Sequence, residues 1–411
     1  MARIFSLRKS TAFASVSLFF VLNFALLWFA QSTGLNRFTM GTHNWAWWAT
    51  KCVLDQKQPI DVFFMGSSLM QRVMDEGEAT YLNEHINGLL HRNSTAMEGL
   101  LKPKFQRHVA TNSYTVGGLH ASDAAMVTAA LLRDEHKPAA IVYGIAPRDM
   151  MNNLLSGPTD TETFQLLNRL RPQPEVANLA YTSSSEKFDH AVSNALITLS
   201  PLYDWRAELS QVFRRRVGRK LNDIANLYVP VPKNPLKLLD QIRLRMSPEE
   251  LTGELSIAPF DPKHPTCEDN RAGYLFAYRP FRARFYERQK VFFQQMLKTA
   301  NERGIQVIVV NMPLRSDNLS AMEPGFYDLY LNDLRAMTAK YNASFMDMND
   351  QITFSHENFT DQVHLNGAGA LKLVQCLAPR LSSVLQTDSV ERRDAGAFIA
   401  GVDESNKELT E

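Results

Sequence analysis

Cysteine is scarce in this sequence, with three residues in a chain of 411. Cys52, Cys267 and Cys376 are too few and too widely spaced for a disulfide framework or a metal cluster. Cys376 lies in an apolar helical pattern, so we predict that it is a small core residue. Cys52 and Cys267 could pair if the domain is exported, but the sequence does not give the geometry that a disulfide requires.

A surplus of one charge is also lacking, because the formal net charge is only +1. A nearly neutral chain gives no reason to expect nucleic acid as a partner. The histidines show no metal-ligand spacing, such as two histidines four residues apart on a helix, so a metal-dependent hydrolase finds little support. We therefore predict no nucleic-acid partner, no metal and no cofactor.

A long hydrophobic run is present near the N-terminus. Three basic residues among the first nine precede the uncharged stretch Thr11–Ala30, whose length of about 20 residues suits a bilayer core of ~30 Å. Positive charge before such a stretch keeps the N-terminus in the cytoplasm and exports the rest. A cleaved signal peptide is the alternative, but Trp28 fits poorly before a cleavage site at Gln31, where small residues are usual. We predict that residues 1–35 form a cytoplasmic stub and an uncleaved transmembrane anchor, with the rest periplasmic or on the cell surface.

After this stretch, short apolar runs of strand type alternate with helical patterns. The alternation predicts an α/β domain with a mainly parallel five-stranded sheet. The expected strands are Ile60–Met65, His108–Asn112, Ala139–Tyr143, Ile305–Asn311 and Ser344–Met348. The expected helices are Ala121–Glu135, Phe281–Arg303, Phe326–Tyr341 and Ala368–Leu385.

The interval from about residue 152 to residue 279 interrupts this alternation. It is rich in proline and contains further helical patterns, so we interpret it as a mostly helical insertion between the third and fourth strands. The predicted α/β domain, with this insertion, spans residues 56–388. The polar residues 389–411 have the composition of a disordered tail.

The first expected strand runs into Gly66-Ser67-Ser68-Leu69 and then into a helical pattern. Such a turn raises a hydroxyl to the carboxyl edge of a parallel sheet, where open α/β folds place their sites. The start of the following helix also offers N–H groups to a developing negative charge. Taken alone, the pattern is equally typical of a turn and a helix N-cap.

A second pattern stands near the C-terminus, where Asp361 precedes His364 by three residues in front of a helical pattern. A nucleophilic serine needs a base to take its proton, and the base needs a partner that fixes its tautomer. An aspartate from the same loop can supply that partner. By itself, Asp-x-x-His is a common surface turn.

Together these patterns resemble the first and last blocks of the SGNH (GDSL-like) hydrolases. A glycine block, Asn112-Ser113-Tyr114-Thr115-Val116-Gly117-Gly118, follows the second expected strand as it does in that family. The resemblance implies a flavodoxin-like three-layer sandwich with Ser68 as nucleophile, His364 as base and Asp361 as its orienting acid. It also implies that the N–H groups of Ser68 and Gly118 form an oxyanion hole.

The third block departs from the family pattern. Many SGNH members end this strand in Gly-x-Asn-Asp, and the Asn side chain points into the oxyanion hole. This chain has Gly144-Ile145-Ala146-Pro147-Arg148-Asp149 instead. Arg148 could replace the asparagine as a charged donor, or it could cap the next helix or pair with Asp149. Arg315, after the fourth strand, ranks below it.

The anchor, the second serine and the large insertion look most like the anchored SGNH branch of surface-polymer acylation. That branch includes the D-alanine transfer protein and the alginate O-acetyltransferase accessory proteins. The resemblance implies an O-acyltransferase or esterase that acts on an exported or cell-envelope polysaccharide, with a multispanning membrane acyltransferase as a partner. The alternative is a catalytically degenerate SGNH domain that binds polysaccharide or scaffolds an export complex. The Ser68–His364 distance discriminates between them.

Overall fold

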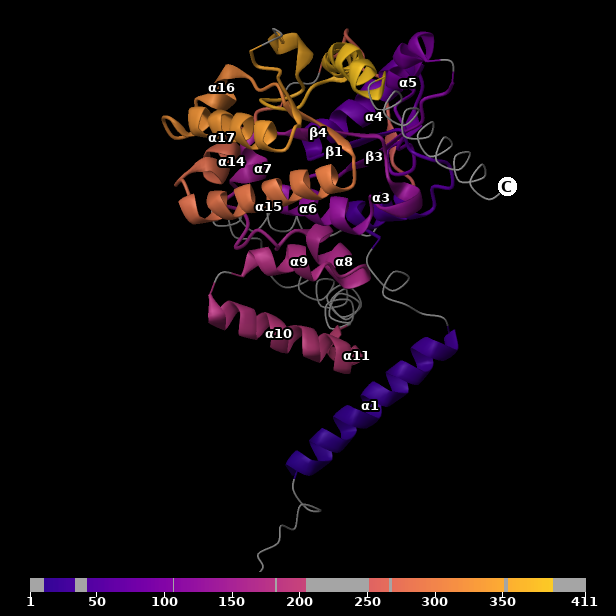
Figure 1. Cartoon of the computed structure of the whole chain (residues 1–411), viewed down its shortest axis with the longest axis vertical. Helices are drawn as coiled ribbons and strands as arrows, with labels where there is room; N and C mark the ends of the chain where they lie inside the picture. The colour runs from indigo at the N-terminus through magenta and orange to yellow at the C-terminus, as the bar shows by residue number, and fades with distance from the viewer. Residues whose placement is uncertain are drawn as a thin grey trace, which may run out of the picture. The chain divides into compact units, whose positions relative to one another are not determined.

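The protein is described by a computed structural model, and its elements are labelled in Figure 1. The described residues are 11–33, 43–105, 107–181, 183–204, 251–265, 268–350 and 354–386. Cys267 and the predicted tail at 389–411 lie outside them. The chain divides into two compact units, with Met1–Asn44 and Tyr181–Glu250 in the smaller, and Trp45–Ala180 and Leu251–Glu411 in the larger.

The larger unit is an α/β structure built on a five-stranded sheet, as predicted. The strands lie in the order β3-β1-β4-β6-β7, and every adjacent pair is parallel. Their bounds are β1 Val62–Gly66, β3 Thr111–Thr115, β4 Ala140–Ile145, β6 Gln306–Asn311 and β7 Ser344–Asp347. All residues of β1 and β4 are buried, because a parallel sheet is covered on both faces and its central strands can be apolar throughout.

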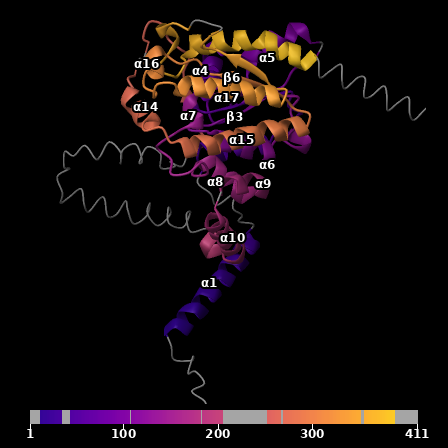
Figure 2. The ribbon, with the colours of Figure 1, turned by 60° about the vertical axis from the view of Figure 1, so that its left-hand side comes forward.

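Helices cover both faces of this sheet. The helices α6 and α15 pack against each other on one face, and α4 lies on the opposite face in both ribbon views (Figures 1 and 2). The main helices are α3 Trp45–Leu54, α4 Ser68–Leu82, α5 Thr95–Leu101, α6 Ala121–Ala130, α14 Arg271–Tyr278, α15 Ala283–Glu302, α17 Phe326–Lys340 and a C-terminal helix over residues 367–386. Shorter helices are α7 Pro147–Met150, α8 Glu162–Leu170, α9 Pro174–Ala177 and α16 Ser316–Leu319.

Two predicted boundaries were wrong. The second strand was expected at His108–Asn112, but β3 begins at Thr111 and ends at Thr115. Its residues are mostly polar yet all buried, so hydropathy does not mark it. The helix expected to reach Glu135 ends at Ala130, because Asp134 adopts a left-handed φ of 52° and a separate short turn of helix follows.

The middle of the chain, predicted as a mostly helical insertion between the third and fourth strands, contributes several short helices to the larger unit. The helices α8, α9 and α14 belong to the larger unit, and α8 packs on α6. A short strand, β5 Ser256–Ile257, pairs antiparallel with β2 Ile86–Asn87. This two-stranded sheet was not predicted, because two-residue strands leave no periodic signal in a sequence.

The smaller unit contains α1 Thr11–Thr33, α10 Ser184–Leu199 and α11 Pro201–Asp204. Within it, the side-chain oxygen of Asn23 accepts hydrogen bonds from Ser200 Oγ at 2.8 Å and from Leu202 N at 3.2 Å, and these bonds tie α1 to α11. In the described ranges, no helix combines the length and apolar character needed to cross a bilayer. The transmembrane anchor stays a prediction.

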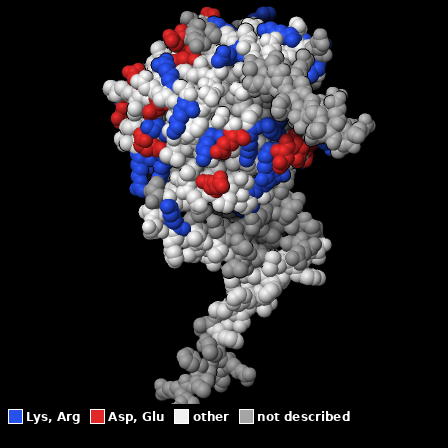
Figure 3. Space-filling view, viewed as in Figure 1, with Lys and Arg blue, Asp and Glu red and all other residues white. Residues whose placement is uncertain are grey.

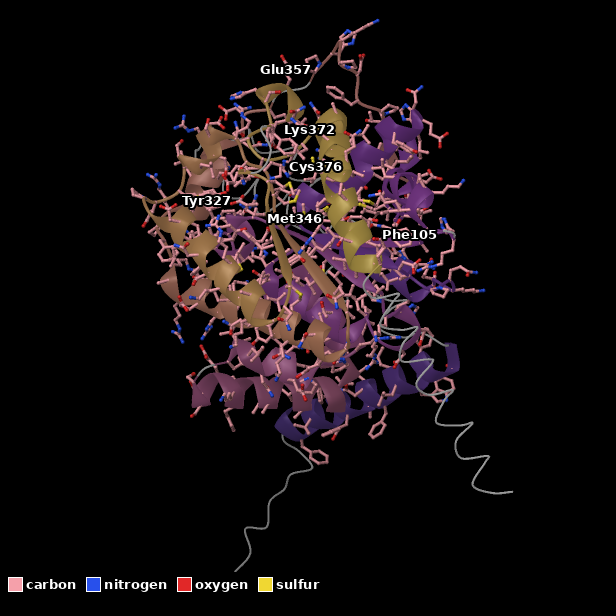
Figure 4. The ribbon with its side chains drawn as sticks, turned by 45° about the horizontal axis from the view of Figure 1, so that its top comes forward. Phe105, Tyr327, Met346, Glu357, Lys372 and Cys376 are labelled. Carbon is pink, nitrogen blue, oxygen red and sulfur yellow. The ribbon has the colours of Figure 1, made fainter. Side chains whose placement is uncertain are left out.

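Two surface features bear on the sequence predictions. Figure 3 shows acidic and basic side chains interspersed over the visible face of the larger unit, consistent with the small net charge. Cys376, on the C-terminal helix in Figure 4, is half-buried and free. We predicted a small core residue, and Cys376 is only partly in the core, whereas its neighbours Leu373, Val374 and Leu377 are buried.

Candidate active site

The site begins where β1 runs into α4. Gly66 ends β1 and Ser68 is the first residue of α4. A methyl group on Gly66 would lie 2.7 Å from the carbonyl oxygen of Gly144 and 2.7 Å from Met70 Cβ, so only glycine fits this close approach of strand and helix. Ser67 is extended at the N-cap of α4 and buried, whereas Ser68 is half-buried and accessible to a substrate.

Ser68, His364 and Asp361 form a continuous hydrogen-bonded chain. The hydroxyl of Ser68 lies 2.8 Å from Nε2 of His364, and Nδ1 of His364 lies 2.6 Å from Oδ2 of Asp361. An ionised carboxylate can only accept, so Nδ1 carries the hydrogen and Nε2 is left as the acceptor of the serine proton. The structure thus brings together three residues selected from two sequence patterns 296 residues apart.

Asp361 lies on a tight turn that we call the base loop, residues 360–364. Its Oδ1 accepts the N–H groups of Val363 and His364, both at 2.8 Å. Its Oδ2 accepts from His364 and from the side-chain amide of Asn270 at 2.8 Å. Burial opposes ionisation of Asp361, but hydrogen bonds and charge attraction from His364, with the backbone N–H bonds, outweigh burial and lower the pKa of Asp361 to about 2.

Close packing between α4 and the C-terminal helix holds Ser68 and His364 at a fixed distance from each other. A methyl group on Gly77 would lie 3.0 Å from Cβ of Ala370, and one on Gly367 would lie 2.0 Å from Oγ1 of Thr80. The side-chain oxygen of Asn366 accepts the N–H of Gly369 at 3.0 Å at the start of the C-terminal helix. Both ends of the Ser–His contact are therefore attached to helices that touch.

Ser67, which precedes Ser68, has a different environment. Its hydroxyl donates to Oδ2 of Asp149 at 3.2 Å, and the same oxygen accepts the N–H of Ala146 at 2.9 Å. Burial raises the pKa of Asp149 to about 7, and these two hydrogen bonds only partly offset it. The geometry therefore separates the two serines, since Ser68 faces the histidine and Ser67 faces a buried carboxyl group.

The glycine block forms a turn next to Ser68. Leu119 N donates to Val116 O at 3.1 Å, and Gly118 has a left-handed φ of 76°, which glycine adopts without strain. A methyl group on Gly117 would lie 4.0 Å from Cβ of Ser68, whereas one on Gly118 would meet no atom within 4 Å. A side chain on Gly117 would therefore point toward Ser68, and the predicted donor Gly118 is its neighbour in the turn.

Arg148 lies on α7, directly after β4, and is half-buried. Its guanidinium lies 5.2 Å from the ring centre of Tyr274, and no carboxylate of the described residues lies within ion-pair distance of it. Arg315, by contrast, pairs with Asp317 at 2.9 Å. The alternative that Arg148 pairs with Asp149 does not hold, because Asp149 is turned toward Ser67.

Three polar neighbours of the site were not predicted. Asn270 bonds Asp361, as described above. Glu76 lies on α4, one turn after its ion-pair partner Arg72, and near His364 and Asp361. Burial raises the pKa of Glu76, and the positive charges of Arg72 and His364 oppose this shift. Beneath the glycine turn, Nδ1 of His120 lies 2.6 Å from Gly118 O, and burial lowers the pKa of His120 to about 4. Only the fold brings these residues to the site.

Among the described residues, no group of three or more His, Cys, Asp and Glu side chains could hold a metal ion. The arrangement that is present is suited to nucleophilic chemistry at a carbonyl, with a serine, an oriented imidazole and N–H donors at a helix start.

Comparison with known proteins adds one match. A family model described as a protein of unknown function, DUF1574, matches residues 261–381. The matched region contains Asp361, His364 and Asn270 but not Ser68. No curated protein matches the chain.

Proposed function

We propose that this protein is a serine acyl-transfer enzyme of the SGNH type, an O-acyltransferase or esterase that works through an acyl-serine intermediate. The observation that carries the proposal is the Ser68–His364–Asp361 chain, with contacts of 2.8 Å and 2.6 Å. A serine hydroxyl in hydrogen-bond contact with an imidazole, itself oriented by a carboxylate, is the arrangement that activates an otherwise weak nucleophile.

The reaction follows from these contacts. Ser68 Oγ attacks the carbonyl carbon of an ester as its proton passes to Nε2 of His364. The tetrahedral intermediate collapses, and His364 returns that proton to the leaving alcohol. An acceptor hydroxyl, from a sugar or from water, then gives its proton to His364 and attacks the acyl-serine, which releases the acylated acceptor or the acid and regenerates Ser68. Asp361 stays ionised throughout and stabilises the imidazolium.

The oxyanion is bound, in this proposal, by three groups. Two are the N–H of Ser68 at the start of α4 and an N–H of the glycine turn, Gly118 by family resemblance. The third is the Arg148 guanidinium, which stands in the block where the family has asparagine. The support for Arg148 is its place at the carboxyl end of β4 and the lack of a carboxylate partner among the described residues.

The topology supports the same location. Numbered along the chain, the five strands lie in the order 2-1-3-4-5, the order of flavodoxin-like folds, in which ligands bind where the strand order reverses. In this protein that switch point lies between β1 and β4. Ser68 follows β1 and Arg148 follows β4, so both stand at the switch point. We therefore propose a flavodoxin-like three-layer sandwich as the finer description of the fold.

The proposed setting is the outer side of a membrane. The basic residues before the uncharged N-terminal stretch favour an anchor with its N-terminus in the cytoplasm. An anchored acyl-transfer domain there would act on an exported or cell-envelope polysaccharide, and a multispanning membrane acyltransferase is the proposed acyl supplier.

The second candidate function is a degenerate SGNH domain that binds polysaccharide or scaffolds an export complex. The observation that favours it is the absence of the block-three asparagine. The 2.8 Å contact between Ser68 and His364 weighs against it, because a site that had lost its reaction would have no need to keep that geometry.

Paired serine variants test the proposal. We expect Ser68→Ala to lower kcat on a short-chain p-nitrophenyl ester by at least about a thousandfold, because the nucleophile is removed. Ser67→Ala should stay within about tenfold, since it loses one hydrogen bond to Asp149. Equal activity of Ser68→Ala and the unaltered protein would refute the proposal and favour the scaffold.

A further inference from the structure

The base loop is held by a segment from a distant part of the chain, residues 268–270. Glu268 N donates to Thr360 O at 2.8 Å. The side-chain amide nitrogen of Gln362 donates to Asp269 Oδ1 at 2.8 Å. The segment and the loop are thus joined by main-chain and side-chain bonds in both directions, although they are separated by about 90 residues of sequence.

Asn270 makes the contact that reaches the catalytic chain. Its Nδ2 donates to Oδ2 of Asp361 at 2.8 Å, and this is the oxygen that also accepts Nδ1 of His364 at 2.6 Å. Its own N–H donates to Oε1 of Gln362 at 2.8 Å. Asn270 is therefore fixed at its backbone and at its side chain, and it covers the outer edge of a carboxylate whose other oxygen is already satisfied.

We propose that Asn270 is a positioning residue for the acyl-transfer reaction, an inference that rests on the function proposed above. Two donors on one carboxylate oxygen fix the plane of the carboxyl group, and this plane sets the direction of the imidazole. The amide also takes up part of the negative charge of Asp361, which moderates its attraction for a protonated imidazole. Asn270 acts through Asp361 and His364 and does not touch the reacting atoms.

The same helix carries a second contact to the site. Tyr274 follows Asn270 by four residues, so the two side chains project from one face at the start of α14. Tyr274 packs against Arg148, while Asn270 bonds Asp361. The segment from Asn270 to Tyr278 therefore forms one wall of the site, with the acid at one end and the proposed oxyanion donor near its middle.

Among the described residues, the titratable and charged groups near Asp361 and His364 come from several segments. From α4 come Glu76 and its ion-pair partner Arg72, and from α14 comes Tyr274. Asp269 and Arg315 adjoin the base loop at Gln362, Asp269 through its carboxylate and Arg315 through its main-chain N–H. These groups are the same in the unaltered protein and in Asn270 variants. A change in the pH profile between those variants therefore reports the contact of Asn270 and not the titration of Glu76.

The test is the pH profile of kcat/KM on a neutral p-nitrophenyl ester. For Asn270→Ala we expect kcat to fall about five- to tenfold with KM unchanged, which is the size of one lost hydrogen bond. The acid limb, where the imidazole becomes protonated, should move to higher pH. Asn270→Asp should move it further, by about 0.5 to 1 unit, because a second carboxylate stabilises the imidazolium.

Asn153→Ala is the matched control. Nδ2 of Asn153 donates to the carbonyl oxygens of Phe276, at 3.3 Å, and Pro280, at 2.9 Å, at the far end of α14, so its loss loosens the same helix without touching Asp361. We expect its acid limb to stay in place. An unmoved acid limb in both Asn270 variants, or an equal shift in Asn153→Ala, overturns the positioning role. Mapping a fluorophosphonate adduct to Ser68 in all variants keeps that outcome separate from a failure of the proposed function.

Discussion

The two ends of β1 differ in how their polar groups are used. At the carboxyl end, Ser68 starts the hydrogen-bonded chain of the candidate site. Around the amino end lies a cavity of about 750 Å³ whose lining includes Asp61, Glu98, Arg107 and His108. There, Arg107 holds Asp61 through two bonds of 2.7 and 2.8 Å, and His108 lies 3.8 Å from Glu98.

This difference shows that cavity size and chemistry are separate properties. A large pocket is the usual first choice for a binding site, yet the cysteine in the lining of this one, Cys52, bonds the carbonyl oxygen of Leu89 and not a base. The acidic side chains of the lining have basic partners, Asp55 with Lys51, Asp61 with Arg107 and Glu98 with His108. The candidate site has a hydroxyl, an imidazole and a carboxylate arranged in sequence, so that each group changes the reactivity of the next.

Two buried carboxyl groups near Ser68 differ in the same way, because their partners shift their pKa values in opposite directions. Hydrogen bonds and attraction from His364 outweigh burial and lower the pKa of Asp361 to about 2. Asp149 is also buried but has only the neutral donors Ala146 and Ser67, and its pKa rises to about 7. Asp361 is therefore charged at every working pH, whereas Asp149 is close to half-protonated at neutrality.

The largest difference in kcat is expected between alanine variants of two histidines, His364 at the candidate site and His108 at the cavity. We expect His364→Ala to lower kcat by at least about a thousandfold, because Ser68 loses its base. We expect His108→Ala to stay within about twofold, because its side chain is 71% exposed. Ester hydrolysis by both purified variants measures this, and similar losses in the two would remove the distinction between site and cavity.

The next largest difference in kcat is expected between Arg148→Ala at the candidate site and Arg107→Ala at the cavity. Arg148→Ala should lower kcat on a neutral ester by about a hundredfold if the guanidinium binds the oxyanion. Arg107→Ala should leave kcat within about twofold and cost at most about 1 kcal/mol of stability, since Arg107 is exposed and its ion pair with Asp61 is a surface one. Unchanged kcat in Arg148→Ala, at unchanged thermal stability, would exclude Arg148 from the oxyanion hole.

The smallest expected effect concerns Asp149 and stability. The folded protein keeps the proton of Asp149 up to about pH 7, whereas an unfolded aspartate releases it near pH 4. Its contribution to the free energy of unfolding is therefore complete below pH 4 and is lost as pH rises to 7. Asp149→Asn should reduce the fall of stability over this range, by up to about 1 kcal/mol per pH unit.

Chemical denaturation at several pH values measures this slope. Asp75 and Asp123 are buried and shifted in the same direction, each to a pKa of about 7, so part of the slope should remain in the variant. Asp55→Asn is the control, because Asp55 is exposed and pairs with Lys51, four residues earlier in the chain. A slope that is the same in Asp149→Asn and in the unaltered protein would contradict the assignment.

The sheet and the contacts among Ser68, His364 and Asp361 could be predicted from the sequence, because both leave local patterns in it. Four of the five strands were found within two residues of their bounds from apolar runs alone. Ser68 was selected from a glycine-serine turn after a strand, and His364 from an Asp-x-x-His pattern before a helix. The two patterns together, through their resemblance to the SGNH blocks, made them candidates. The polar strand β3 was displaced, since its buried threonines and asparagine are satisfied by partners that no local pattern reveals, such as Glu98 at Thr111.

The surroundings of the site could not be predicted, because they depend on contacts between distant segments. Asn270 is an exposed residue in a proline-rich interval, and nothing near it indicates that it bonds Asp361. The bond from Ser67 to Asp149 joins residues 82 apart. Likewise, family resemblance placed the oxyanion donor at Gly118, whereas only the turn geometry shows that a side chain on Gly117 would point toward Ser68.

The most direct test is covalent labelling with a fluorophosphonate probe followed by mapping of the modified peptide. A nucleophilic serine activated by His364 should carry one adduct on the peptide that contains Ser68. The adduct should be absent from Ser68→Ala and retained in Ser67→Ala. No adduct on the folded, unaltered protein, or an adduct on Ser67 instead, would contradict the assignment of Ser68 as the nucleophile.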